Sequence, residues 1–153
     1  MNEQSPDDEA KPDASGASSD AQATIAELRG VMRTFVAERN WQKFHAPKNL
    51  AMALAIEAAE LMERFQWLDV AESRAIPPNS AEAEAIREEV ADVFCYTLAI
   101  ANELGFDLSQ AFVRKMAKNR QKYPAEEYRG RYGKGDDRPV EPSAAGESGG
   151  AGA

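Results

Sequence analysis

The sequence predicts an all-α protein, a four-helix bundle that assembles as an oligomer, with disordered tails at both ends. Apolar residues recur at spacings of three and four along most of the chain, and Gly, Pro and Asn interrupt this pattern where helices would end. No segment alternates with period two for long enough to form a strand. The oligomer follows from broad apolar faces on a small core, which neighbouring copies would cover.

The first half of the domain is expected to form two helices. The first spans about 21–39 and places apolar residues on one face. The second begins at Pro47, whose fixed φ suits a first helical turn, and runs to about Trp67. The segment 69–78, which ends in two prolines, is expected to be a loop.

The second half is expected to form two more helices. The third spans 79–104, with Asn79 as its N-cap and Gly105 at its end. The fourth is capped by Asp107 and stops before Tyr123, because a residue that precedes a proline avoids helical backbone angles.

The charge of the chain predicts where the folded domain lies. Of the 153 residues, we expect a domain at 21–135 between a disordered acidic tail at 1–20 and a disordered Gly/Ala/Ser-rich tail at 136–153. The formal charge of -8 belongs to these tails, since 1–20 carries -5 and 136–153 carries -3. The domain is therefore neutral, which argues against a nucleic acid polymer as partner.

The cellular setting is also predicted from composition. Cys95 is the single cysteine, so no intramolecular disulfide forms, and the N-terminus lacks the basic start and apolar run of a secretory signal. No uninterrupted apolar stretch reaches the ~18 residues of a membrane span. We expect a cytoplasmic protein without a membrane partner.

Two of the predicted helices each carry a pair of carboxylates at spacing i, i+3 on the side that faces the core. A projection at about 100° per residue places Glu57 in the middle of an apolar stripe and Glu60 at its edge. On the next helix, Glu89 and Asp92 form a column with Tyr96 along the margin of the stripe. Burying ionised carboxylates together is costly, so we expect a cation to compensate them.

Two explanations of these acids are open at this point. In the first, the acids form salt bridges to Arg or Lys, or simply line a wet groove. In the second, they hold a hard divalent ion such as Mg²⁺ or Mn²⁺. A di-iron bundle needs a Glu-x-x-His on each of two helices, and the only histidine, His45, lies outside both. This excludes the usual di-iron pattern and leaves an oxygen-only site, which suits Mg²⁺ or Mn²⁺.

Other side chains are suited to a nucleotide. Lys115 and Asn119 lie on one face of the fourth helix, with Tyr123 just beyond. Trp41 and Trp67 flank the helix that carries the first carboxylate pair, where they are suited to stacking on a flat base. A solvated basic face and aromatic caps of a core are the plainer explanations of the same residues.

The chain from about 25 to 125 resembles the MazG-like all-α nucleoside triphosphate pyrophosphohydrolases, in particular the dCTP pyrophosphatase branch. The resemblance lies in four runs of sequence in the same order: RNWQKFHAPKNL, EAAELMERFQW, EEVADVFCY and KMAKNRQKYP. It implies hydrolysis of a nucleoside triphosphate, foremost dCTP or a modified dCTP, to the monophosphate and pyrophosphate. It also implies a requirement for Mg²⁺ and a homotetramer built as a dimer of dimers.

The resemblance also implies roles for individual residues. The metal ligands and catalytic residues would be Glu57, Glu60, Glu89 and Asp92, with Glu57 or Glu60 orienting or deprotonating a water. The substrate-binding residues would be Trp41, His45, Lys48, Asn49, Trp67, Tyr96, Lys115, Asn119 and Tyr123.

One departure from the family leaves the base open. Met32 stands where the family's dCTP enzyme has a histidine near the nucleotide, and base discrimination depends on a few placed hydrogen bonds. A dUTP-preferring or broad-specificity triphosphate pyrophosphohydrolase is therefore an alternative. A non-catalytic helical oligomer that binds nucleotide is a second alternative, from a different functional class.

Overall fold

A computed structural model describes residues 19–131, 133 and 135 of the chain. These residues form helices and no strand, which confirms the predicted all-α class. Apart from residues 19 and 20, the tails that the sequence predicts to be disordered lie outside the described residues. Within the described part, no helix is both long enough and apolar enough to cross a membrane.

The chain divides into two compact units, residues 1–108 and 109–153, and each is described by itself. The elements of the first unit are α1 (Ile25–Glu38), the 3-10 helix η1 (Gln42–Phe44), α2 (Pro47–Glu63), α3 (Val70–Arg74) and α4 (Ala81–Glu103). Those of the second are α5 (Leu108–Lys122), which begins at the boundary, and α6 (Ala125–Tyr128).

Side-chain caps set where the helices of the first unit begin. The Thr24 hydroxyl accepts from the backbone N–H of Glu27 at 3.2 Å, and the Glu27 carboxylate accepts from the N–H of Thr24 at 2.7 Å. This capping box starts α1 four residues later than the periodicity predicts. Asn79 was predicted to cap α4, but Ser80 does so, because its extended backbone lets the hydroxyl accept from Ala83 N–H at 3.1 Å.

The predicted loop at 69–78 contains a helix, α3. Asp69 and Glu72 form a second capping box, with bonds of 2.7 and 2.8 Å between each carboxylate and the other residue's backbone N–H. These two bonds satisfy backbone N–H groups at the start of the helix, which have no partner inside so short a helix. Five residues of helix therefore form in a segment whose prolines predicted a loop. The preceding helix, α2, ends at Glu63 instead of near residue 67.

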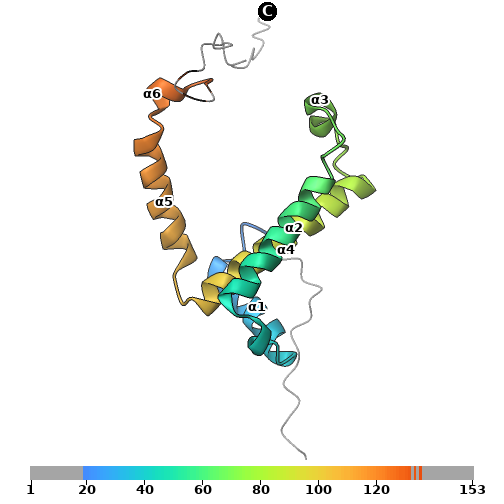
Figure 1. The fold of residues 1–153 in the computed structure, drawn as a ribbon, viewed down its shortest axis with the longest axis vertical. Helices are drawn as coiled ribbons and strands as arrows, with labels where there is room; N and C mark the ends of the chain where they lie inside the picture. The colour runs from blue at the N-terminus through green and yellow to red at the C-terminus, as the bar shows by residue number, and fades with distance from the viewer. Residues whose placement is uncertain (1–18, 132, 134, 136–153) are drawn as a thin grey trace, which may run out of the picture. The chain divides into compact units, whose positions relative to one another are not determined.

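The core of the first unit lies where α2 and α1 pack on α4, and α2 and α4 run side by side (Figure 1). Its buried apolar side chains are Val36, Leu50, Ala83, Leu98, Ala99 and Ala101. Half of these are alanines, which allow helix backbones to approach closely. The core is therefore small.

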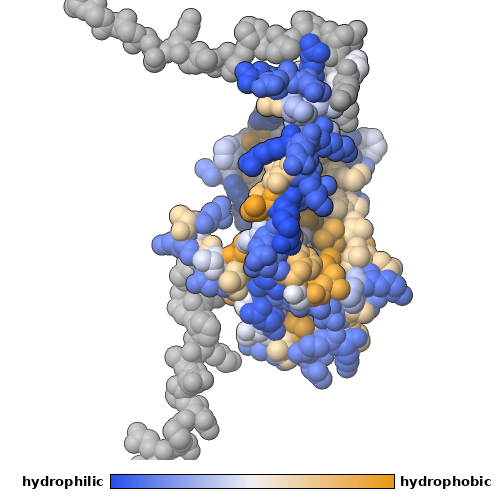
Figure 2. Space-filling view, turned by 90° about the vertical axis from the view of Figure 1, so that its left-hand side faces the viewer, coloured by the Kyte–Doolittle hydropathy of each residue, from blue (hydrophilic) through white to orange (hydrophobic). Residues whose placement is uncertain are grey.

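Large apolar side chains remain exposed around this core. Val31 on α1 is 68% exposed and Met62 on α2 is 69% exposed. In the second unit, Phe112 and Val113 are each 65% exposed, although Figure 2 shows mainly hydrophilic side chains over the face of α5 that it presents. Apolar surface of this extent is typical of a face that other protein covers.

A hydrogen-bond network fixes α1 against α4. The Oδ1 atom of Asn102 accepts from Arg29 Nε at 2.9 Å and from Arg33 Nη1 at 3.1 Å, and its Nδ2 donates to the backbone oxygen of Arg29 at 3.0 Å. Because one amide side chain satisfies groups on the other helix in both directions, this contact sets the register between α1 and α4.

The chain leaves α1 through a left-handed residue. Asn40 has a φ of 52°, a conformation that asparagine tolerates better than most residues. The next residue, Trp41, donates its backbone N–H to the carbonyl of Val36 at 3.0 Å. This turn brings Trp41 and His45, on either side of η1, back toward α1 and α4.

Candidate functional site

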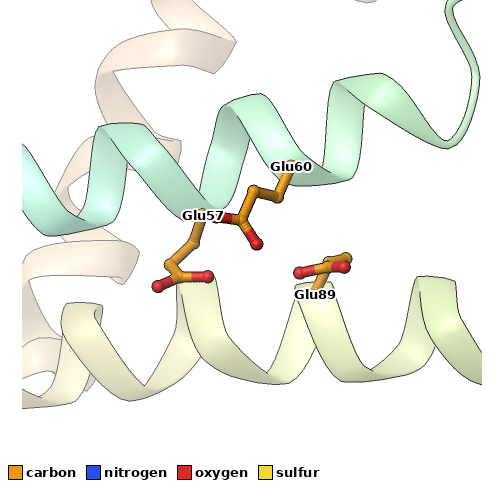
Figure 3. A group of neighbouring side chains, drawn as sticks. All are labelled: Glu57, Glu60 and Glu89. Atoms are coloured by element: carbon orange, nitrogen blue, oxygen red, sulfur yellow. The ribbon is translucent and has the colours of Figure 1, made fainter.

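Three of the four predicted carboxylates converge between α2 and α4. Figure 3 shows Glu57 and Glu60 projecting from α2 toward Glu89, which projects from α4. One carboxylate oxygen from each of the three lies within 4.8 Å of the others. The spacing i, i+3 places the two α2 side chains on one face, and the packing of α2 on α4 brings the third opposite them. We call these three residues the carboxylate cluster.

The deepest member of the carboxylate cluster is compensated by an arginine. Glu89 is only 8% exposed, and its Oε1 accepts from Nη2 of Arg64 at 2.9 Å. The hydrogen bond to Glu89 raises the pKa of Arg64 above its usual value. One salt bridge is thus present, as one of the two sequence-based explanations predicts, and the other two carboxylates of the cluster form none among the described residues.

Glu57 experiences the combined charge of its neighbours. Burial raises the pKa of Glu57 first of all, and the negative charges of Glu60, Asp92 and Glu89 raise it further. Asp92 is exposed and is not among the three residues whose oxygens converge, but its charge reaches Glu57. The other three predicted acids therefore all act electrostatically on Glu57, and a cation placed among them would relieve this repulsion.

The donor set fits a hard divalent ion. The carboxylate cluster offers oxygen atoms only, from residues that are partly or wholly withdrawn from solvent except for Glu60. Mg²⁺ and Mn²⁺ prefer such ligands, usually completed by water and by substrate phosphates. Glu57, Glu60 and Glu89 are the residues that could hold the ion, with Asp92 one turn along α4 from Glu89.

A cavity of about 500 Å³ adjoins this cluster, formed by α1, α4 and the segment around η1. Its lining is largely apolar and aromatic. The residues are Leu28, Val31, Met32, Phe35, Trp41, His45, Ala91, Asp92, Phe94, Cys95, Tyr96 and Leu98. Three predicted substrate-binding residues, Trp41, His45 and Tyr96, thus line one cavity, and Asp92 joins it to the carboxylates.

Electrostatics also connect the cavity with the cluster. The pKa of Tyr96 is raised by burial and by the charges of Glu57 and Asp92. Burial likewise raises the pKa of the Cys95 thiol, so the thiol stays protonated and neutral at pH 7. Trp41 packs edge-on against Phe35, with ring centroids 5.8 Å apart. The cavity therefore combines aromatic faces with a negatively charged edge.

Several of these residues escape sequence reasoning. Phe35 and Phe94 line the cavity but look like ordinary core positions of their helices. Arg64 follows Glu60 by four residues, and this same-face spacing is the signal that identifies it as the cation of the cluster.

Three predicted substrate-binding residues lie apart from this cavity. Trp67 is 86% exposed and lines a separate cavity of about 430 Å³ together with Arg64. Lys48 is exposed, and Asn49 donates from Nδ2 to the backbone oxygen of Phe44 at 3.1 Å, which supports η1 locally. The geometry gives none of the three a contact with the carboxylates.

The remaining predicted residues lie in the second unit. Lys115 and Tyr123 are exposed, and Asn119 lies on the same face of α5 one turn after Lys115. The Tyr123 ring packs edge-on against Tyr128 at 5.2 Å between centroids, and its hydroxyl raises the pKa of Lys122 through a hydrogen bond. Since this unit is described by itself, a role for Lys115, Asn119 and Tyr123 at the phosphates stays a prediction.

Residues 52–137 match the model of the MazG-like family, and this match spans more than half of the chain. The chain belongs to the MazG-like family. The resemblance drawn from the four sequence runs is thereby confirmed. The matched region contains all four predicted metal ligands, and it begins after Trp41 and His45.

The chain is also similar to dCTP pyrophosphatase 1 of Mus musculus, with 43% identity over 109 residues, and to that of Homo sapiens, with 40% identity over 102 residues. These alignments cover 70% and 67% of this chain, but only 63% and 60% of the two relatives. Among solved structures, a pyrophosphatase from Archaeoglobus fulgidus is similar, with 38% identity and a TM-score of 0.60. That match covers 65% of this chain and 92% of the archaeal one.

Proposed function

We propose that this MazG-like protein is a metal-dependent nucleoside triphosphate pyrophosphohydrolase that converts dCTP or a modified dCTP to the monophosphate and pyrophosphate. The observation that carries the proposal is the convergence of Glu57, Glu60 and Glu89 within 4.8 Å beside an aromatic cavity. Converging carboxylates can hold the metal ion that a bound polyphosphate needs, and an aromatic cavity can stack on a planar base. The names of the curated relatives and of the archaeal structure agree with this activity.

In the proposed reaction, the carboxylates of α2 and α4 hold Mg²⁺ or Mn²⁺. When bound, the ion neutralises phosphate charge and polarises the phosphorus centre that water attacks. Glu57 and Glu60 are our candidates for accepting the proton of that water, because both project from α2 into the carboxylate cluster (Figure 3). Lys115, Asn119 and Tyr123 are proposed to bind the phosphates from α5.

The cavity between α1 and α4 is proposed to hold the base and sugar. Trp41 supplies an exposed ring for stacking, and His45 and Tyr96 supply polar atoms to the lining. Met32 contributes an apolar surface at the same cavity. Trp67, Lys48 and Asn49 would then act from outside the cavity, Trp67 on the substrate of a neighbouring subunit.

Assembly and location complete the proposal. We propose a homotetramer located in the cytoplasm. The exposed apolar side chains of α1 and α2 around a small core support the assembly of several copies. Residues 21–135 would act as one domain in that assembly. Light scattering coupled to size exclusion tests the oligomeric state, and a monomeric mass would contradict it.

The test of the function is product identification. The protein is incubated with dCTP, 5-methyl-dCTP, dUTP and dATP, with and without Mg²⁺, and the products are separated by chromatography and assigned by ³¹P NMR. We expect monophosphate and pyrophosphate, formed only with the ion. Diphosphate and orthophosphate would contradict the proposed reaction.

The same assay separates the alternatives. Fastest turnover of dUTP, or equal turnover of all four nucleotides, would favour the alternative substrate classes. A protein that turns over none of them, while a nucleotide still raises its melting temperature, would be a binding module.

A further inference from the structure

Arg64 occupies a defined place relative to the carboxylate cluster. It is the C-cap residue of α2, one helical turn after Glu60 and two turns after Glu57, so all three side chains leave the same side of the helix. From there Nη2 of Arg64 reaches across to Oε1 of Glu89 on α4 at 2.9 Å. The side chain of Arg64 is 39% exposed, whereas that of Glu89 is 10% exposed.

The ion pair therefore links a solvent-facing cation to the most buried acid of the cluster. A carboxylate as buried as Glu89 is destabilising without a partner. Among the described residues, Arg64 is the one cation that forms an ion pair with a member of the cluster. The protein thus carries its own compensation for charge that a divalent ion would otherwise balance.

We propose that Arg64 is a positioning residue that acts as the internal counter-ion of the carboxylate cluster, and that it competes with the metal for Glu89. This inference rests on the proposed metal site. Its consequence is that the fold does not require the metal, and that the cluster binds the ion more weakly than its carboxylates alone would.

The sign of the effect follows from a thermodynamic cycle. Removal of Arg64 destabilises the metal-free protein, because Glu89 is left buried without a partner. The same removal destabilises the metal-bound protein less, because the ion then balances Glu89. The difference between the two losses is a gain in metal affinity, as linkage requires.

The test measures Mn²⁺ affinity by electron paramagnetic resonance with no nucleotide present. Arg64→Gln removes the charge and leaves a shorter polar side chain, and Arg64→Lys retains the charge. Arg39→Gln is the matched control, because Arg39 is the C-cap of α1, is 40% exposed and pairs with Glu38, outside the cluster.

We expect Arg64→Gln to bind Mn²⁺ about fivefold more tightly, the upper range for a partly exposed ion pair, while Arg64→Lys and Arg39→Gln match the wild type. In EDTA, Arg64→Gln should melt below the wild type, and saturating Mg²⁺ should recover most of the loss. If it is unfolded in EDTA, folding on addition of Mg²⁺ supports the proposal, and failure to fold even then overturns it.

Weaker or unchanged Mn²⁺ binding by Arg64→Gln also overturns it, as does an equal loss of melting temperature with and without Mg²⁺, which indicates a purely structural salt bridge. These outcomes leave the proposed hydrolysis standing, since wild-type turnover is measured separately. A wild-type protein that binds no Mn²⁺ would instead remove the metal site and this inference together.

Discussion

Replacing Glu57 by Gln should make the metal-free protein more stable while abolishing its response to Mg²⁺. The amide has the shape of the carboxylate but carries no charge, so the substitution removes repulsion from Glu60 and Glu89 without opening a cavity. Loss of stability is the usual result of altering a partly buried residue, so a gain has a specific meaning.

The magnitude follows from the geometry of the cluster. Two unit charges 4.8 Å apart repel by about 0.9 kcal/mol at the dielectric constant of water, and Glu57 has two such neighbours with oxygens within that distance. Arg64 offsets part of this repulsion at Glu89. We therefore expect a gain of about 1 kcal/mol, or about 4 °C in melting temperature for a domain of this size.

Differential scanning calorimetry in EDTA and in a Mg²⁺ series measures both effects. The wild type should gain stability with increasing Mg²⁺, whereas Glu57→Gln should start higher and stay flat. Glu88→Gln is the control, because Glu88 is an exposed acid on α4 outside the cluster. A Glu57→Gln protein that melts below the wild type in EDTA, or that retains the full Mg²⁺ response, would refute the reasoning.

Four further outcomes are expected. Asp92→Asn should lower hydrolysis about 100-fold, the cost of displacing a reacting group by about 1 Å, with a melting temperature in EDTA no lower than that of the wild type; full activity in a steady-state assay would contradict its role. The free energy of unfolding of the metal-free protein should fall as the pH rises through the folded-state pKa of Glu57, because that pKa is raised above the usual 4.5. Urea unfolding across this pH range measures how steeply the stability falls, and Glu57→Gln should make the dependence flatter. Trp41→Ala should raise KM about tenfold through lost stacking, with Phe44→Ala, outside the cavity, as its control. Leu50→Ala should cost about 2 to 5 kcal/mol in denaturant unfolding, because Leu50 is 2% exposed.

Helical periodicity predicted the centre of the site because it depends on local geometry alone. A turn of 3.6 residues fixes that Glu57 faces the same way as the apolar residues around it, whatever lies opposite. The all-α class and the MazG-like family could be predicted for the same reason, from patterns within single helices and from their order. Which acid pairs with which cation depends on the register of α2 against α4. That register cannot be predicted from the periodicity within one helix.

Helix ends and exposure were less predictable. Trp67 was predicted to lie in the second helix, but α2 ends at Glu63 and Trp67 projects into solvent. Asn79 and Ser80 are both good N-caps by composition, and only the extended backbone of Ser80 decides between them. Both outcomes depend on how neighbouring segments compete for the same backbone donors.

The two halves of the carboxylate cluster are joined by residues 64–80, a connection that contains α3. Inserting a single residue inside α2 or α4 would rotate every later side chain of that helix by about 100°, and would move its acids off the shared face. An insertion between α3 and α4 leaves both helices intact. The segment between α3 and α4 is therefore the place where we expect this protein to accept a new loop, an affinity tag or a fluorescent label, whereas insertions within α2 or α4 would disrupt the cluster.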